Sequence, residues 1–206
     1  MNRLSLIIGM TLLTGIGAQA DIIVVNPVVT GSGPFVWSYD FLLSSNQDVN
    51  SGVAPPTNPV SSDLTIGGFA TIYDFAGYVA GSCAGPAGWT CTAQNVGYTP
   101  DTLVPTDNPN ITNITWAYTS GPTIDGVSPF VDLGLFLATS LYSTPIQVSY
   151  TGRGILNTGP GAGTVSANVG ATNGPEATTP EPATGAVIGL GLIGIACLKR
   201  RFGMRV

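Results

Sequence analysis

The chain has 206 residues, with six Lys or Arg, eleven Asp or Glu and no His, and its formal net charge is −5. The absence of His excludes Ser-His-Asp and Cys-His nucleophile pairs and His metal ligands. All the acids lie between Asp21 and Glu181, where eleven acids against one base, Arg153, give a net charge of −10, and this charge disfavours a nucleic-acid partner.

Residues 1–20 have the three parts of a secretory signal peptide. Arg3 gives a basic start, residues 4–16 form an apolar stretch, and Ala18 and Ala20 form a small-x-small cleavage site before Asp21. A membrane-spanning helix is the alternative, but the apolar stretch is short for one. The sequence therefore predicts export and removal of residues 1–20.

Residues 21–171 predict a β-rich exported domain. They are rich in Gly, Pro, Thr, Ser and Asn and contain no long segment of helical period, whereas short alternating segments between turn residues are typical of strands. The expected strands cover residues 22–29, 35–41, 64–75, 111–118, 130–137, 146–151 and 164–169. This pattern predicts an antiparallel β-sandwich or jelly roll, with one buried and one solvated face on each sheet.

Some of these segments carry predictions about single side chains. Every second residue of 35–41 is aromatic, which predicts a buried aromatic face. Four aliphatic residues of 130–137 are expected to share one face: Val131, Leu133, Leu135 and Leu137. Gly67 and Gly68 mark an expected bulge within residues 64–75, and residues 46–62 are expected to form a long surface loop.

Two cysteines enclose a short loop. Cys83 and Cys91 flank the seven residues AGPAGWT, and we expect them to form a disulfide in an oxidising exported domain. Trp89 lies in this loop and is the tryptophan most suited to being presented to a ligand, whereas Trp37 and Trp116 follow strand alternation and are expected in the core. The third cysteine, Cys197, is expected to act as a small hydrophobic residue.

The carboxylates match no binding motif. Three lie in loop-like contexts without the spacing of an EF-hand loop, namely Asp101, Asp107 and Asp125. Three others lie in or at the ends of expected strands, which leaves open the facing pair that a glycosidase needs, namely Asp40, Asp74 and Asp132. The balance of these observations predicts no catalytic, cofactor-binding or metal site, and we expect a protein that is not an enzyme.

The C-terminal part of the chain has the features of a tethered tail. Residues 172–182 predict a flexible polar linker. Residues 183–198 are uncharged and apolar and are expected to form one transmembrane helix, although sixteen residues reach only about 24 Å at helical rise. Residues 199–206 form a basic tail that belongs on the cytoplasmic side, so the acidic domain lies outside the inner membrane.

Pro180, Glu181 and Pro182, an apolar Gly-rich span and the basic cluster Lys199, Arg200 and Arg201 occur in this order. Together they resemble the PEP-CTERM sorting signal of exported bacterial proteins. The resemblance implies that a membrane protease, exosortase, recognises the Pro-Glu-Pro motif and releases or transfers the protein. A permanent single-pass anchor is the alternative.

These observations predict an exported cell-surface or extracellular-matrix protein whose domain is structural or adhesive. Until it is processed, it would be tethered to the inner membrane by its C-terminal segment. The expected partners are exosortase and the extracellular polysaccharide. A carbohydrate-binding module that uses Trp89 is the alternative function, and a glycan hydrolase is a third.

Overall fold

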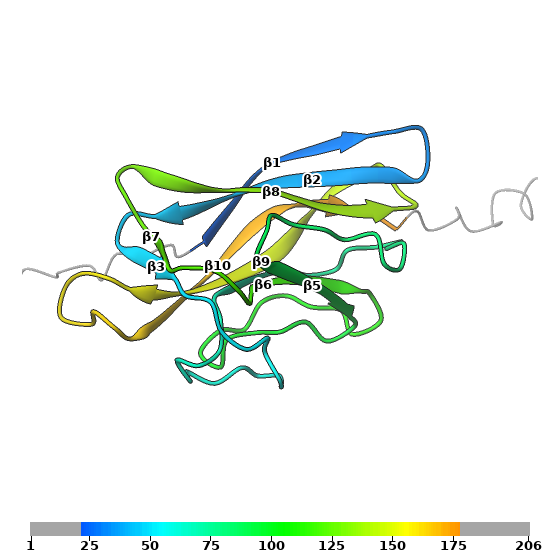
Figure 1. The fold of residues 1–206 in the computed structure, drawn as a ribbon. Helices are drawn as coiled ribbons and strands as arrows, with labels where there is room; N and C mark the ends of the chain where they lie inside the picture. Colours follow the sequence, from blue (N-terminus) through cyan, green and yellow to red (C-terminus); the bar gives the residue numbers. More distant parts are fainter. Residues whose placement is uncertain (1–21, 178–206) are drawn as a thin grey trace, which may run out of the picture.

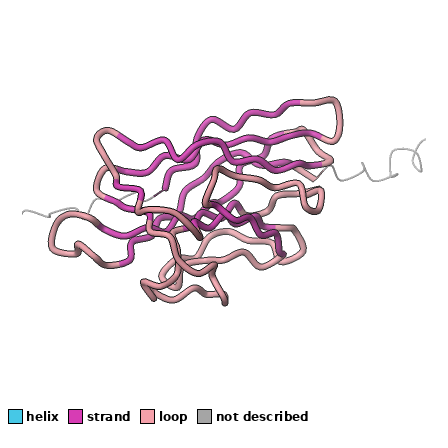
Figure 2. The backbone as a smooth tube through the Cα atoms, viewed as in Figure 1, coloured by secondary structure: helices cyan, strands magenta, loops and turns pink. Residues whose placement is uncertain are grey.

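A computed structural model describes residues 22–177, which form ten strands and no helix (Figures 1 and 2). The strands are β1 (Ile22–Thr30), β2 (Phe35–Ser44), β3 (Gln47–Val49), β4 (Phe69–Ile72), β5 (Trp89–Gln94), β6 (Asn113–Tyr118), β7 (Ile124–Asp125), β8 (Phe130–Ser140), β9 (Pro145–Leu156) and β10 (Val165–Pro175).

The strands form two sheets that face each other across one core (Figure 1). The first sheet has the order β1-β2-β8. The second has the order β5-β6-β4-β9-β3-β7, and β10 pairs with β9 as well. All strand pairs are antiparallel. This arrangement confirms the predicted all-β, sandwich-like fold.

The aromatic residues of β2 point into the core, as the sequence predicts. Trp37, Tyr39 and Phe41 alternate along the strand and are fully buried. The ring of Phe41 stacks on that of Phe136 with a centroid separation of 4.0 Å and meets the edge of Trp116 at 5.6 Å. Because such rings bury large apolar areas and prefer these geometries, they hold the two sheets together.

Strand β8 departs from its predicted alternation at Gly134. The register between β2 and β8 shifts here by one residue, and Gly134 has a φ of +99°, which favours glycine. Leu133 is buried before this bulge, but Phe136 is the buried residue after it. The prediction that Leu135 and Leu137 share the face of Leu133 is therefore wrong.

Loops cover the outer face of the second sheet at β4 and β6, so the prediction of one solvated face per sheet is wrong for these two strands. Every residue of β4 and β6 is buried. Val60, Ile66 and Tyr98 of the covering loops pack with Phe69 and Ala117 on this face. The covering loops thus add a second, smaller apolar cluster to the domain.

Arg153 of β9 attaches one of these loops to the sheet. Its side chain is 1% exposed, and its guanidinium donates hydrogen bonds to backbone carbonyl oxygens of Ile66 (2.8 Å), Gly67 (3.2 Å) and Asp63 (2.6 Å). A buried cation needs such partners to offset its lost hydration. Arg153, the only Lys or Arg between Asp21 and Glu181, therefore has a structural role.

Two predicted segments in the covering loops need correction. Residues 64–68 precede β4 and are not part of a strand, so the bulge expected at Gly67 and Gly68 is not present. A Cβ at Gly67 would collide with the carbonyl oxygen of Tyr118, which explains the glycine differently. The expected surface loop 46–62 contains β3 and the buried side chain of Val60.

The last strand is longer than the sequence predicts. β10 continues to Pro175, which pairs with Pro145, so the first four residues of the expected linker belong to the sheet. β5 was not expected as a strand, and it pairs with β6 from Trp89 to Gln94. The predicted disulfide between Cys83 and Cys91 is present and connects β5 to the loop that precedes it.

Candidate functional site

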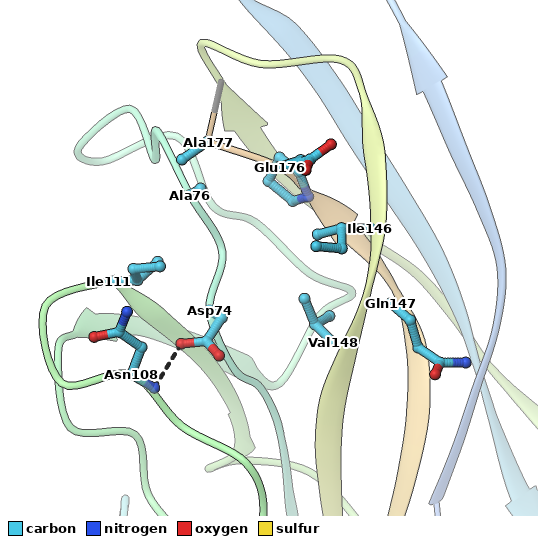
Figure 3. Close-up of a pocket in the computed structure, with 10 residues that line it drawn as sticks. Asp74, Ala76, Asn108, Ile111, Ile146, Gln147, Val148, Glu176 and Ala177 are labelled. Atoms are coloured by element: carbon cyan, nitrogen blue, oxygen red, sulfur yellow. Dashed lines mark hydrogen bonds between the residues drawn. The ribbon is translucent and has the colours of Figure 1, made fainter. Parts of the chain in front are cut away.

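A cavity of about 270 Å³ opens at the end of the sandwich where β10 finishes (Figure 3). It is lined by Asp74, Ala76, Asn108, Ile111, Ile146, Gln147, Val148, Pro175, Glu176 and Ala177. Figure 3 shows Asp74 between Asn108 and Ile111 on one side and Ile146 and Val148 on the other. Most of the lining is apolar, with carboxylates contributed by Asp74 and Glu176.

The sheet topology gathers these residues at one end. β4 and β10 both run antiparallel to β9, so they finish at the end of the sheet where β9 begins. The segment after β4 therefore meets the first residues of β9 and the last residues of β10. Glu176, just beyond β10, donates its backbone N–H to the carbonyl oxygen of Thr144 in the β8–β9 loop (2.8 Å).

Asn113 fixes the position of Asp74. Asp74 has a φ of +54°, which is uncommon for a residue other than glycine. Its backbone N–H donates to Oδ1 of Asn113 (2.7 Å), and its Oδ1 accepts the backbone N–H of Asn108 (2.8 Å). Nδ2 of Asn113 donates in turn to Oδ1 of Asp107 (2.9 Å). Asp74 is thus held at its backbone by Asn113 of β6 and at its carboxylate by Asn108 of the loop that precedes β6.

The surroundings of Asp74 disfavour its negative charge. Burial raises the pKa of its carboxyl group, the hydrogen bond from Asn108 lowers it in part, and the nearby charge of Asp107 raises it further. A cationic group in the cavity would offset this cost. The arrangement therefore suits an amine or guanidinium on an apolar stem, with the stem against Ile146 and Val148.

The structure separates the carboxylates that the sequence left open as a facing pair. Asp40 and Asp132 lie on the outer face of the first sheet, whereas Asp74 follows β4 of the second sheet. Oδ2 of Asp40 accepts a hydrogen bond from Asn26 (3.3 Å), and Oδ1 of Asp132 accepts the backbone N–H of Gly134 (2.8 Å). Asp74 therefore pairs with neither of the other two.

The three carboxylates that the sequence places in loop-like contexts without the spacing of an EF-hand, Asp101, Asp107 and Asp125, lie in different parts of the fold. Asp107 accepts a hydrogen bond from Asn113, and Asp125 lies in β7, which pairs with β3. Asp101 lies in a loop, directly after Pro100, which forms an isolated β-bridge with Val60. Within residues 22–177, no group of three or more His, Cys, Asp or Glu side chains is placed to hold a metal ion.

Trp89 is not presented to solvent as the sequence suggested. It is half-buried at the start of β5, with its ring 5.3 Å from that of Tyr118 and 5.0 Å from that of Phe136 (centroid separations). The pairing of β5 with β6 directs this side chain toward the core. Trp37 and Trp116 are fully buried, as predicted. The residue that motivated a carbohydrate-binding module is therefore part of the packing.

The sequence does not predict most of the cavity. It predicts a linker at Glu176 and a strand at Ile146, and the hydrogen bonds that Asn113 and Asn108 make with Asp74 join segments 39 and 34 residues apart. A lone asparagine at the start of an expected strand gives no signal of such a role. The non-glycine φ of Asp74 cannot be read from its neighbours either.

Residues 178–201 match the family model of the PEP-CTERM protein-sorting motif. The chain therefore carries a PEP-CTERM sorting signal. This signal marks an exported protein that is targeted by exosortase, a membrane enzyme. No curated protein and no solved structure matches the chain.

The other predictions for the two ends of the chain lie outside the described residues. These are the signal peptide with its cleavage site at Ala18 and Ala20, the linker from residue 178 onward, the transmembrane segment 183–198 and the basic tail 199–206. Within residues 22–177, no helix is long and apolar enough to cross a membrane.

Proposed function

We propose that this protein is a structural or adhesive component of the cell surface or extracellular matrix, which exosortase processes at Pro180-Glu181-Pro182. The observation that carries this proposal is the sorting motif at residues 178–201, which begins directly after the last described residue of a folded β domain. The prolines favour an extended segment, which suits binding in a protease cleft.

The architecture of the domain supports a durable extracellular role. One disulfide, one aromatic core and loops bound to the outer face of the second sheet hold the described residues together. A net charge of −10 across residues 21–181 favours solubility outside the cell. We infer that this domain works by contact with other molecules and not by catalysis.

The outer face of the first sheet is the surface that we propose for adhesion to extracellular polysaccharide. Val28 and Leu135 are each 51% exposed on this face. Ser38 and Asp40 of β2 lie between them in the register. Such a face offers apolar contacts together with hydroxyl and carboxylate groups that can hydrogen-bond the hydroxyls of an extended glycan chain.

The processing step is tested with Glu181→Ala in a host that contains exosortase, with Asp101→Ala as a control on an exposed loop. Pulse-chase labelling and membrane fractionation follow the full-length and processed forms. We expect the Glu181→Ala protein to accumulate at full length in the membrane and the control to be processed normally. Normal processing of Glu181→Ala would count against the proposed function.

The adhesive role is tested separately on the processed protein. Cosedimentation with purified polysaccharide from the host is expected to be weakened by Ser38→Ala and Leu135→Ala, and unchanged by Val127→Ala at a loop outside this face. Equal cosedimentation of all the variants would remove the first sheet from the proposal.

A further inference from the structure

The folded domain ends very close to the sorting motif. The hydrogen bond from Glu176 to Thr144 fastens the chain two residues before the motif begins at residue 178. Residues 178–182 separate Ala177 from the apolar span, and five residues can reach at most about 18 Å. An enzyme that binds Pro180-Glu181-Pro182 must therefore lie beside the end of the sandwich where the chain leaves.

That end carries exposed apolar side chains around the cavity. Leu141 of the β8–β9 loop is 60% exposed, and Ile146 at the start of β9 is 44% exposed. Ile146 also lines the cavity, together with Asp74 and Glu176 (Figure 3). The backbone N–H of Leu141 bonds to the carbonyl oxygen of Gly77, next to the lining residue Ala76. We define the cavity with its residues Asp74, Ile146 and Glu176, together with Leu141, as the exit surface.

We propose that the exit surface is a docking site for exosortase, which places apolar side chains against Leu141 and Ile146 and a Lys or Arg side chain in the cavity. This inference rests on the proposed processing by exosortase. Docking next to the motif would raise the effective concentration of the motif at the active site, as a second linked contact does in any bivalent complex.

Charge favours this occupant over two others. An anionic lipid surface would be repelled by Asp74 and Glu176. A second copy of the chain that used the same surface would bring these carboxylates together across a two-fold axis. A partner with a basic side chain and apolar neighbours complements both features of the surface.

Photo-crosslinking identifies the occupant directly. A photo-crosslinking amino acid replaces Leu141 in the full-length Glu181→Ala protein, which is expected to remain in the membrane, and Val127 serves as the matched control position. We expect a covalent product with exosortase from position 141 and none from position 127. A crosslink only to a second copy, or only to lipid, would overturn the proposal.

Processing rates test how much the exit-surface side chains contribute to recognition by exosortase. Leu141→Asp/Ile146→Asp is compared with Val53→Asp/Val127→Asp, because both of the latter residues are 58% exposed and lie away from the exit surface. We expect the first pair to slow processing about tenfold, as loss of a central interface contact does, and the control pair to leave it unchanged. Asp74→Asn is expected to slow processing in the same direction without loss of thermal stability.

An inserted spacer distinguishes docking on the exit surface from steric hindrance of the enzyme by the domain. Twelve Gly/Ser residues inserted between Ala177 and Thr178 uncouple the motif from the exit surface, and docking predicts slower processing. Faster processing would show that the domain only obstructs the enzyme, and would overturn the inference. If Glu181→Ala blocks processing while the exit-surface variants are processed normally, the docking inference fails and the proposed function stands. If Glu181→Ala is processed normally, the proposed function itself fails.

Discussion

Replacing Arg153 tests how the covering loops are held. Arg153→Ala removes three hydrogen bonds from a buried guanidinium to backbone carbonyl oxygens of residues 63–67. A hydrogen bond to a charged group contributes about 1.5–3 kcal/mol. The three do not add fully, because the released loop carbonyls regain water, so we expect a loss of about 3–5 kcal/mol in the free energy of unfolding, less than the full sum.

The assay combines urea denaturation with amide hydrogen exchange. The backbone N–H of Val53 bonds to the carbonyl oxygen of Thr65, and that of Gly67 bonds to Val53, so both amides are expected to lose protection when the loop opens. Arg153→Lys keeps the charge but loses the planar fork, and it is expected to lose less stability than Arg153→Ala. A loss below about 0.5 kcal/mol with unchanged protection at both amides would refute the tethering role.

Three further predictions concern the core, the disulfide and the cavity. In urea denaturation, Phe136→Ala should lower the free energy of unfolding by about 3–5 kcal/mol, and Leu135→Ala should lower it by less than about 1 kcal/mol. Similar losses for the two variants would contradict the bulge at Gly134, which buries Phe136 and exposes Leu135. Cys83→Ser/Cys91→Ser should cost about 2.5 kcal/mol by the chain-entropy relation, and unaltered stability would show that the ring constrains nothing. Because the pKa of Asp74 is raised, its ionisation disfavours the folded state: stability falls as pH rises from the unfolded-state pKa through the folded one. Asp74→Asn should therefore raise the Tm at pH 7 but not at pH 3, and an equal effect at both values would contradict this reasoning.

Strands with one buried face could be predicted from the sequence, because apolar and polar residues alternate along them. This holds for β2, where the aromatic residues from Trp37 to Phe41 point inward. It fails at Gly134, because a single bulge reverses the direction of every later side chain in β8. It also fails for β4 and β6, because loops that are distant in sequence bury the second face.

The two parts of the functional interpretation differ in how far the sequence could predict them. The sorting motif is a local pattern of Pro, Glu, apolar and basic residues, and the family match confirms it. The cavity depends on Asn113, Asn108 and Glu176, which meet only through strand register and loop closure. Such contacts leave no periodic signal, so the site at Asp74 emerges only from the folded chain.

The intact mass of the protein recovered from the cell surface tests the central claim most directly. The account predicts a chain that begins at Asp21, ends within the sorting signal at residues 178–201 and carries an oxidised Cys83–Cys91 pair. A cytosolic protein with the mass of all 206 residues and with free thiols would contradict it.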